Sequence, residues 1–267
     1  MTGAPELVGI RYSPYTEKAL WALDYHRQPY RYREHLVLLG DAILELRIRR
    51  AGGVLPADGL TVPVLFHPEG VLFDSFEILR KVDEEGAARG AEVAARRLIP
   101  EGALPEMKHF NLLADTIMNA GRALYMERLG ASREGQLASF PQWIPARPSW
   151  IRGACLPLVR AGIESINDQF RITRKTSAEY SNHLLQCLVG LRSHREHATS
   201  KDFLWGDRFT AADLVVASAL AVIKPPAFLE SRTKPELFSL WTHPELSREF
   251  DDLLQWRDQI YSRHRKV

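Results

Sequence analysis

The first 85 residues alternate between short apolar runs and segments with helical spacing, a pattern that predicts a sheet covered by helices. Ser13 and Pro14 mark the first helix start, because serine is a preferred N-cap and proline fits the first helical position. The expected elements, in chain order, are a strand over Glu6–Ile10, a helix from Pro14 that ends before Pro29, a strand over Tyr30–Val37, a helix over Gly40–Arg50, strands over Thr61–Phe66 and Val71–Phe73, and a helix over Ser75–Glu84. This βαβαββα order predicts an α/β unit with a mixed four-stranded sheet.

Beyond residue 104 nearly every periodic segment has helical spacing. Residues 86–104, rich in Ala, Gly, Glu and Arg, indicate a linker, and the prolines at 141, 145 and 148 prevent one unbroken helix between the first two helices of the remainder. Helices are expected over Leu104–Leu129, Ser149–Arg171, Ser177–His194, Thr210–Ile223 and Pro244–His264. The predicted domains are therefore residues 1–85 (sheet), 86–104 (linker) and 105–267 (an all-α bundle).

Composition and charge exclude several classes of protein. The chain is 45% hydrophobic and 25% charged, which is typical of a globular protein and unlike disordered or fibrous chains. Its net charge of +2 is too small for an electrostatic footprint on nucleic acid. The longest strongly apolar stretch, Ala211–Ile223, contains Asp213 and is shorter than the roughly 20 residues that span a bilayer. Residues 1–6 show no secretory signal, so we expect a cytoplasmic protein with neither nucleic-acid nor membrane partners.

Cysteine and histidine usage predicts neither disulfides nor a metal site. Cys155 and Cys187 form no CxxC pair and have no zinc-binding spacing. His194 and His197 offer two ligands on a charged helix end, whereas zinc sites normally use three or four. We therefore expect no metal.

The first candidate for chemistry is Ser13, at the junction of strand and helix. A helix N-terminus favours an anion such as a thiolate, and the Ser13 hydroxyl is able to donate a hydrogen bond to it. Tyr12 is a second source of a hydroxyl, and Tyr15 is placed to line a cleft. The alternative is that Ser13 only caps its helix.

Two further motifs each have two interpretations, one as a ligand-binding element and one as a purely structural element. A cis bond between Val62 and Pro63 would turn the main chain of Val62 outward to pair with a peptide-like ligand, or Pro63 simply marks an edge strand. Asp74 and Ser75 match the ammonium and carboxylate of an α-amino acid, or Asp74 caps the helix that follows.

A fourth motif is structural. Thr210 and Asp213 have capping-box spacing, and Phe209 and Leu214 flank them as a hydrophobic staple. The motif predicts the start of a buried helix.

Together, the order and spacing of these four motifs resemble those of cytosolic glutathione S-transferases of the serine type, over essentially the whole chain. The resemblance implies a thioredoxin-like domain followed by an α-helical domain, a homodimer, and glutathione as cosubstrate. It implies that Ser13 activates the glutathione thiol and that Val62 and cis-Pro63 bind the cysteinyl main chain. It also implies that Asp74 and Ser75 hold the γ-glutamyl group.

The resemblance further implies a pocket for a second substrate between the domains. In this family the long helix after the linker borders that pocket, so Tyr15, Met107, Phe110 and Trp143 are candidate lining residues. The helical spacing of Met107 and Phe110 with Leu113, Ile117 and Met118 is equally typical of a core-facing stripe.

The chain departs from the family pattern in two ways. Thr61 stands where many relatives have a lysine for the glycyl carboxylate of glutathione; Lys18, Arg47, Arg49 or Arg50 are possible substitutes. The helical domain is also longer than usual. Because the Ser13 motif contains no cysteine, thiol exchange by a nucleophile of the enzyme's own is disfavoured.

The leading hypothesis is a glutathione transferase that directs the activated thiol at a hydrophobic electrophile. The alternatives are a glutathione-dependent lyase, isomerase or dehalogenase, and a non-catalytic binding or scaffold protein with the same fold, which the Thr61 departure favours.

Overall fold

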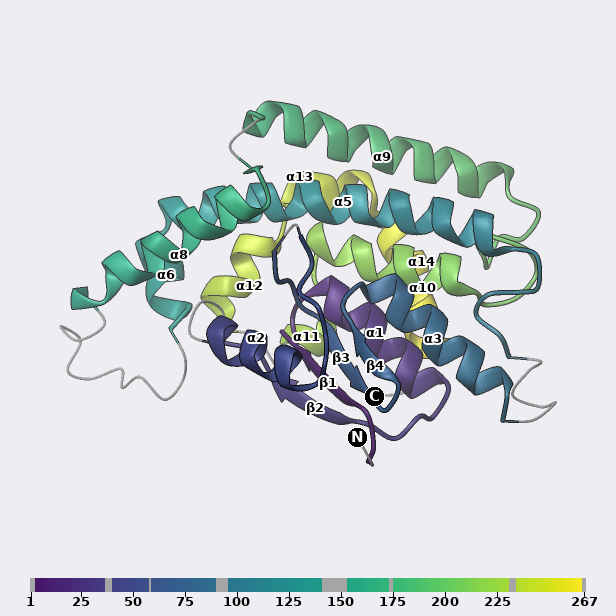
Figure 1. Ribbon diagram of the computed structural model, residues 1–267. Coiled ribbons are helices and arrows are strands. Elements are labelled where there is room, and N and C mark those ends of the chain that lie inside the picture. The colour runs from purple at the N-terminus through teal and green to yellow at the C-terminus, as the bar shows by residue number, and fades with distance from the viewer. Residues whose placement is uncertain are drawn as a thin grey trace.

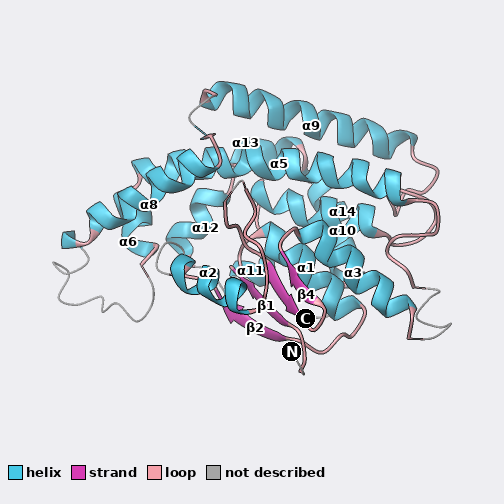
Figure 2. Cartoon of the chain, viewed as in Figure 1, coloured by secondary structure: helices cyan, strands magenta, loops and turns pink. Residues whose placement is uncertain are grey.

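The computed structural model describes residues 3–36, 40–57, 59–89, 96–140, 153–172, 175–230 and 234–265. Its N-terminal part holds the strands with three helices around them, and the rest of the described chain is helical (Figures 1 and 2). The long helices α5 and α9 cross the molecule side by side above the sheet-containing part (Figure 1).

The sheet has the predicted mixed topology of four strands. The N-terminal elements are β1 (Glu6–Gly9), α1 (Pro14–Tyr25), β2 (Arg31–Glu34), α2 (Asp41–Arg50), β3 (Val64–His67), β4 (Gly70–Leu72) and α3 (Ser75–Ala87). The strand order is β2-β1-β3-β4; β1 is parallel to β2 and antiparallel to β3, and β3 is antiparallel to β4. Leu7 pairs with Tyr32 on one side and with Leu65 on the other. The predicted βαβαββα fold is confirmed.

Each face of the sheet is covered by helices because side chains alternate along the two central strands. Leu7 and Leu65 belong to the core that α1 and α3 share with the helical domain. Val8 and Val64 lie on the opposite face, where they pack against Ile48 and other residues of α2. Both central strands are buried along their whole length, and apart from Glu6 and His67 their residues are apolar or Gly.

The third strand begins later than its sequence predicts. The expected start was Thr61, but β3 begins at Val64, directly after a cis peptide bond between Val62 and Pro63. Proline has no N–H to donate to a strand ladder, so pairing starts beyond it. The segment before β3 is therefore free to serve as part of a binding edge.

The helical domain contains the expected long helices and several shorter ones. Its described elements are α5 (Leu104–Ala131), α6 (Arg133–Ala138), α8 (Leu156–Gln169), α9 (Ser177–His197), α10 (Ala211–Ala219), the 3₁₀ turn η2 (Leu220–Val222), α11 (Ala227–Glu230), α12 (Pro235–Trp241), α13 (Pro244–Glu249) and α14 (Asp251–His264). Among these, no helix has the length and apolar character required to cross a membrane.

Two predicted helices differ from the observed ones. The helix expected over 244–264 is divided at Phe250, whose side chain is fully buried and whose backbone leaves helical geometry, so α13 and α14 are separate. The helix expected over 149–171 is described only from residue 153, and α8 begins at Leu156; residues 149–152 lie outside the described part.

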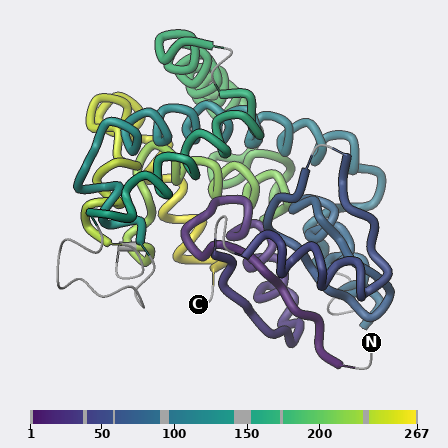
Figure 3. The backbone as a smooth tube through the Cα atoms, turned by 60° about the vertical axis from the view of Figure 1, so that its left-hand side comes forward, coloured from purple at the N-terminus to yellow at the C-terminus, as the bar shows by residue number. Residues whose placement is uncertain are grey.

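One hydrophobic core joins the two parts of the chain. Helix α10 packs against both α1 and α5 and is buried at every position. Leu98 and Ile99, within the expected linker, are buried, and their N–H groups donate to the carboxylate of Asp83. At the other end of the chain, Arg265 binds Glu17 of α1, so the C-terminal end lies against the N-terminal domain (Figures 1 and 3).

Candidate functional site

Ser13 occupies the N-cap position of α1, but its side chain does not cap the helix. Its backbone is extended, with φ −77° and ψ 127°, and its N–H donates to the carbonyl of Ile10 at 2.9 Å. Within the described ranges the Ser13 hydroxyl has no hydrogen-bond partner. The cap-only interpretation therefore fails, and the hydroxyl is available to a ligand.

Helix α1 also presents unused main-chain donors beside this hydroxyl. Pro14, the first helical residue, has no N–H, and the N–H of Glu17 is taken by the carbonyl of Ser13. The N–H groups of Tyr15 and Thr16 belong to the first helical turn, which has no preceding turn to accept from them. This end of α1 is suited to an anion.

Tyr12, the fallback source of a hydroxyl, is directed into the helical domain. It lines a small cavity with Leu229, Phe238 and Trp241. Burial, with a smaller contribution from the negative charge of Glu34, raises the pKa of Tyr12 to about 12. Tyr12 therefore anchors the turn before α1, and Ser13 remains the better candidate for the catalytic hydroxyl.

The main chain of Val62 lies at the edge that the cis bond creates. The bond between Val62 and Pro63 is cis, as expected, and Pro63 is buried. In the part of the chain that the structure describes, neither the N–H nor the carbonyl of Val62 is used in a main-chain hydrogen bond. A peptide-like ligand is able to pair with both.

Asp74 caps α3. Its Oδ1 accepts hydrogen bonds from the N–H groups of Phe76, at 2.8 Å, and Glu77, at 2.9 Å. The structural interpretation of Asp74 is thus confirmed, while its second oxygen takes no part in the cap. Ser75 is the first residue of α3 and is buried.

The start of α1 and the start of α3 lie close enough for their charges to interact. The negative charge of Asp74 contributes to raising the pKa of Tyr15, which burial, the largest cause, brings to about 12. Asp74 also acts on Lys18, whose pKa burial lowers. The structure therefore gathers Ser13, Tyr15 and Asp74 at one end of the N-terminal domain.

Tyr15 connects this region to helix α5. Its hydroxyl donates to Oδ1 of Asn119 at 2.9 Å, and the guanidinium carbon of Arg122 lies 4.9 Å from the centre of its ring. The same guanidinium lies 3.7 Å from the ring centre of Phe170, just beyond α8. Asn119, Arg122 and Phe170 were not predicted as site residues from the sequence. Asn119 and Arg122 are polar residues beside the apolar stripe of α5, and Phe170 reaches them only because the end of α8 lies near α5.

Asn119 and Arg122 open onto a cleft of about 650 Å³ between α5, the end of α8 and the loop before β3. Gln169 bridges this cleft to the N-terminal domain, since its side-chain amide donates to the carbonyl of Leu60 at 2.8 Å. The lining residues are Ala57, Asn119, Arg122, Asp168, Gln169, Phe170, Arg171, Ile172 and Tyr180. The cleft has the position and size of a site for a small molecule.

The other candidate pocket residues lie elsewhere. Met107 and Phe110 are buried in the main core, and Phe110 packs edge-on against the His194 ring of α9. On α5 they precede Asn119 by 12 and 9 residues, which is about 18 and 14 Å along a helix. Trp143 lies outside the described residues.

Two of the four proposed substitutes for the missing lysine are already engaged. Lys18 is fully buried and donates to Asp115 and Asn111. Arg47 forms an ion pair with Glu6. Arg49 and Arg50 are exposed on α2.

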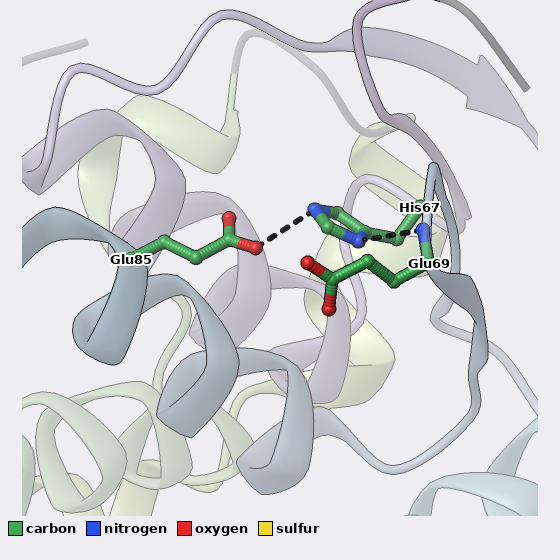
Figure 4. A group of neighbouring side chains, drawn as sticks. All are labelled: His67, Glu69 and Glu85. Carbon is green, nitrogen blue, oxygen red and sulfur yellow. Dashed lines mark hydrogen bonds and ion pairs between the residues drawn. The ribbon is translucent and has the colours of Figure 1, made fainter. Parts of the chain in front are cut away.

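One cluster of potential metal ligands occurs in the described residues: His67, Glu69 and Glu85 (Figure 4). Both ring nitrogens of His67 are used, Nε2 with Glu85 at 3.0 Å and Nδ1 with the N–H of Glu69 at 3.3 Å. Lys81 binds both carboxylates, at 2.6 and 3.2 Å. An ammonium group thus already supplies the positive charge, and the cluster is a network of ion pairs.

The remaining motifs behave structurally. Thr210 and Asp213 form the expected capping box, in which the Asp213 carboxylate accepts from the N–H of Thr210 at 2.9 Å and from that of Leu204 at 2.7 Å. Cys155 and Cys187 are both free.

Comparison with known proteins gives the fold a family context. Residues 7–90 match the family model described as glutathione S-transferase, N-terminal domain. No curated protein sequence matches the chain.

Solved structures are similar along the whole length. Glutathione transferase GSTFuA2 from Phanerochaete chrysosporium is 18% identical with a TM-score of 0.61, and the match covers 100% of both chains. A glutathione S-transferase from Methylobacillus flagellatus with GSH bound is 18% identical with a TM-score of 0.57, covering 97% of this chain and 96% of that one. A third, from Methylobacterium radiotolerans in complex with glutathione sulfonate, is 16% identical with a TM-score of 0.56, covering 98% and 92%. The chain therefore has the glutathione S-transferase fold, and its residues 7–90 match the N-terminal domain of that family.

Proposed function

We propose that the protein is a glutathione transferase in which Ser13 holds the glutathione thiol as a thiolate. The observation that carries the proposal is the free hydroxyl of Ser13 at the start of α1. A serine that only capped its helix would direct this oxygen at the N–H of the second or third helical residue. The crystallised relatives with glutathione or glutathione sulfonate bound support the choice of ligand.

Glutathione would lie along the edge formed by the starts of α1 and α3 and the segment before β3. The main chain of Val62 would pair with the cysteinyl residue, as a strand edge pairs with a peptide. The N-terminus of α3, with Ser75, would take the γ-glutamyl carboxylate, and the free oxygen of Asp74 would accept from its ammonium group.

The chemical step asks little more of the enzyme than stabilising negative charge on sulfur. The hydroxyl of Ser13 donates to the thiolate, and the N–H groups at the start of α1 add a favourable dipole. Lowering the thiol pKa by two units corresponds to about 2.7 kcal/mol of preferential stabilisation of the thiolate. The thiolate then attacks an electrophile held in the cleft, and its sulfur forms the new bond as the leaving group departs.

Ultraviolet absorbance of the bound thiolate, recorded against pH, tests the role of Ser13. In the Ser13→Ala variant the titration is expected to shift toward the pH range of free glutathione, whereas Tyr12→Phe, the matched control, leaves it unchanged. An unchanged titration in Ser13→Ala overturns the role assigned to Ser13. A shift in Tyr12→Phe of the same size would transfer that role to Tyr12.

Two other functions share this fold. A transferase leaves a stable thioether, whereas a glutathione-dependent lyase, isomerase or dehalogenase does not, so product analysis separates them. A binding or scaffold protein is favoured by Thr61 and by the engagement of Lys18 and Arg47 in other ion pairs. Calorimetry with glutathione decides this point, because binding weaker than about 1 mM in the folded protein supports the scaffold.

The proposed function includes a cytoplasmic homodimer, as the resemblance implies. Light scattering on the purified protein measures the oligomeric state directly. A monomer at micromolar concentration would contradict this part of the proposal.

A further inference from the structure

The side chain of Arg122 is half-buried without a carboxylate partner. Its guanidinium lies between two aromatic rings, 3.7 Å from the ring centre of Phe170 and 4.9 Å from that of Tyr15. No ion pair joins it to a carboxylate in the described ranges of the chain. The carboxylate whose charge acts on Arg122 is that of Asp115, which is already bound by Lys18 and Asn111.

Burying the guanidinium of Arg122 costs free energy unless a negatively charged or polar group compensates its charge. Removing a guanidinium from water without a counter-charge is unfavourable, and burial accordingly lowers the pKa of Arg122. The two rings offset part of this cost through cation–π contact. A hydrogen bond with the hydroxyl of Tyr15 offsets a further part. A guanidinium has five N–H donors, so others remain to face another group.

A negatively charged partner for the guanidinium of Arg122 would have to come from a ligand in the cleft. Arg122 and Arg171 both line the cleft, and among the lining residues that the structure describes Asp168 is the only acidic one. Arg171 follows α8 in a left-handed conformation, with φ 52°, and it too forms no ion pair within the described part of the chain. The lining therefore carries an excess of positive charge beside the aromatic side chains of Phe170 and Tyr180.

We propose that Arg122, assisted by Arg171, forms a carboxylate-binding subsite in the cleft that selects flat, apolar acids as second substrates. The inference rests on the proposed function, since it assigns the cleft to the electrophile. A guanidinium binds a carboxylate through two parallel hydrogen bonds, which a neutral ligand cannot reproduce. The ring of Phe170 is positioned to contact the flat body of such an acid.

The carboxylate has a second possible source, the glycyl carboxylate of glutathione. The cleft reaches Ala57 and, through Gln169, the carbonyl of Leu60, so it adjoins the segment in which Thr61 replaces the lysine of many relatives. Arg171 would then replace that lysine from the other domain. The chemistry of the subsite is the same in both cases, and experiment distinguishes the two sources.

Calorimetry with two probes of equal shape tests the subsite without knowledge of the natural substrate. The probes are naphthalene-carboxylate and naphthalene-carboxamide, each titrated into the intact protein with and without saturating S-methylglutathione. The carboxylate is expected to bind about tenfold more tightly than the amide, as a charge-assisted bidentate contact would produce. Equal affinity of the two probes for the wild-type protein overturns the proposal, and this result requires no variant.

Variants then identify the residues. Arg122→Gln is expected to remove the preference for the carboxylate, and Arg122→Lys to restore part of it, because lysine keeps the charge but not the planar fork. Arg171→Gln, on an exposed residue, is expected to reduce the preference by a few-fold, while Arg133→Gln on the exposed face of α6 leaves it unchanged. A preference that survives in Arg122→Gln overturns the assignment.

Saturating S-methylglutathione separates the two sources of the carboxylate. If the naphthalene-carboxylate still binds with its preference intact, the subsite serves the second substrate, as proposed. If binding is lost competitively, the subsite holds the glycyl carboxylate of glutathione and the assignment to the second substrate is wrong. If S-methylglutathione itself does not bind, the proposed function fails, while the comparison of the two naphthalene probes still stands.

Discussion

The hydroxyl of Tyr15 donates a hydrogen bond to Oδ1 of Asn119 at 2.9 Å, and this contact joins α1 to α5 across 104 positions of sequence. Tyr15 follows Ser13 by two residues, and Asn119 lines the cleft. The bond therefore couples the position of the proposed catalytic hydroxyl to a wall of the cleft.

A double-mutant cycle measures this coupling. Tyr15→Phe and Asn119→Ala are each expected to weaken the protein, and the double variant is expected to lose less than the sum, with a coupling of about 1 kcal/mol in the free energy of unfolding. Thr116→Ala serves as control, because its hydroxyl bonds only to the carbonyl of Leu112 within the same helix. Additive effects of Tyr15 and Asn119 would show that the bond contributes nothing to holding the domains together.

Substituting Asp115 is expected to cost more folding free energy than substituting its ion-pair partner Lys18. The Lys18 side chain has no exposure, whereas that of Asp115 is 29% exposed and also accepts from Asn111. Asp115→Ala therefore leaves a fully buried ammonium without its counter-charge and is expected to cost about 3–5 kcal/mol of folding free energy. Lys18→Met leaves a carboxylate that water and Asn111 can solvate, so its expected cost is smaller, about 1–2 kcal/mol.

Urea unfolding of the two single variants provides the comparison. The Lys18→Met, Asp115→Ala double variant is expected to be more stable than Asp115→Ala alone, because it leaves no unpaired ammonium buried at this position. A Lys18→Met variant that is the less stable of the two single variants would contradict this account of the pair.

Short sequence motifs were enough to predict most of the fold and the part of the candidate site that lies in the N-terminal domain. Ser13, Pro63 and Asp74 lie at junctions of strand and helix or at a proline, where sequence dictates backbone geometry directly. Helix α12, which was not among the expected helices, also has such a signal: Pro235 and Glu236 begin it just as Pro244 and Glu245 begin α13. Short helices of this kind are therefore detectable from their first two residues.

The remaining features depend on contacts between distant segments. The pairing of Arg122 with Phe170 requires α5 and the end of α8 to meet, and no local pattern specifies that meeting. The break at Phe250 arises because the buried ring holds that residue in the core while α13 and α14 run to either side. Phe250 shows no Pro or Gly signal in the sequence that would mark the break.

Helix α5 contains two glycines whose environments predict opposite effects of substitution. A Cβ added at Gly121 would overlap Val222, with Cγ2 only 2.6 Å away, whereas a Cβ at Gly130 would meet nothing within 4 Å. Gly121→Ala is expected to destabilise the protein by about 1–3 kcal/mol through overpacking. Gly130→Ala is expected to stabilise it by up to about 1 kcal/mol through helix propensity.

Thermal unfolding of Gly121→Ala and Gly130→Ala checks this pair of effects. Because both residues belong to α5, differences in helix propensity largely cancel, and the remaining difference reports the close approach of η2. Similar melting temperatures for the two variants would show that α5 and η2 can separate without cost.

The pH dependence of stability is predicted from His243, which precedes α13. Burial, with a smaller contribution from the positive charge of Arg128, lowers the pKa of His243 from 6.5 to about 4, and its Nδ1 accepts from the Arg128 guanidinium at 2.8 Å. Between these two values the unfolded chain binds a proton that the native protein does not. The contribution of His243 to stability is therefore present above about pH 6.5 and is lost as the pH falls toward 4, up to about 3 kcal/mol.

His243→Asn isolates this contribution, because the asparagine oxygen is able to accept from Arg128 but does not titrate. Asp213 acts in the opposite direction over a similar range, since burial raises its pKa to about 7 and makes the native protein bind the extra proton. The measured quantity is therefore the difference in unfolding free energy between wild type and His243→Asn at each pH, which is expected to shift in favour of the variant on acidification. His109→Asn, on the exposed face of α5, is expected to follow the wild type. If the difference in unfolding free energy stays constant from pH 7 to pH 4, His243 takes up its proton at the same pH in the native protein as in the unfolded chain. Its hydrogen bond with Arg128 would then have to break as it is protonated, and this result would contradict the prediction.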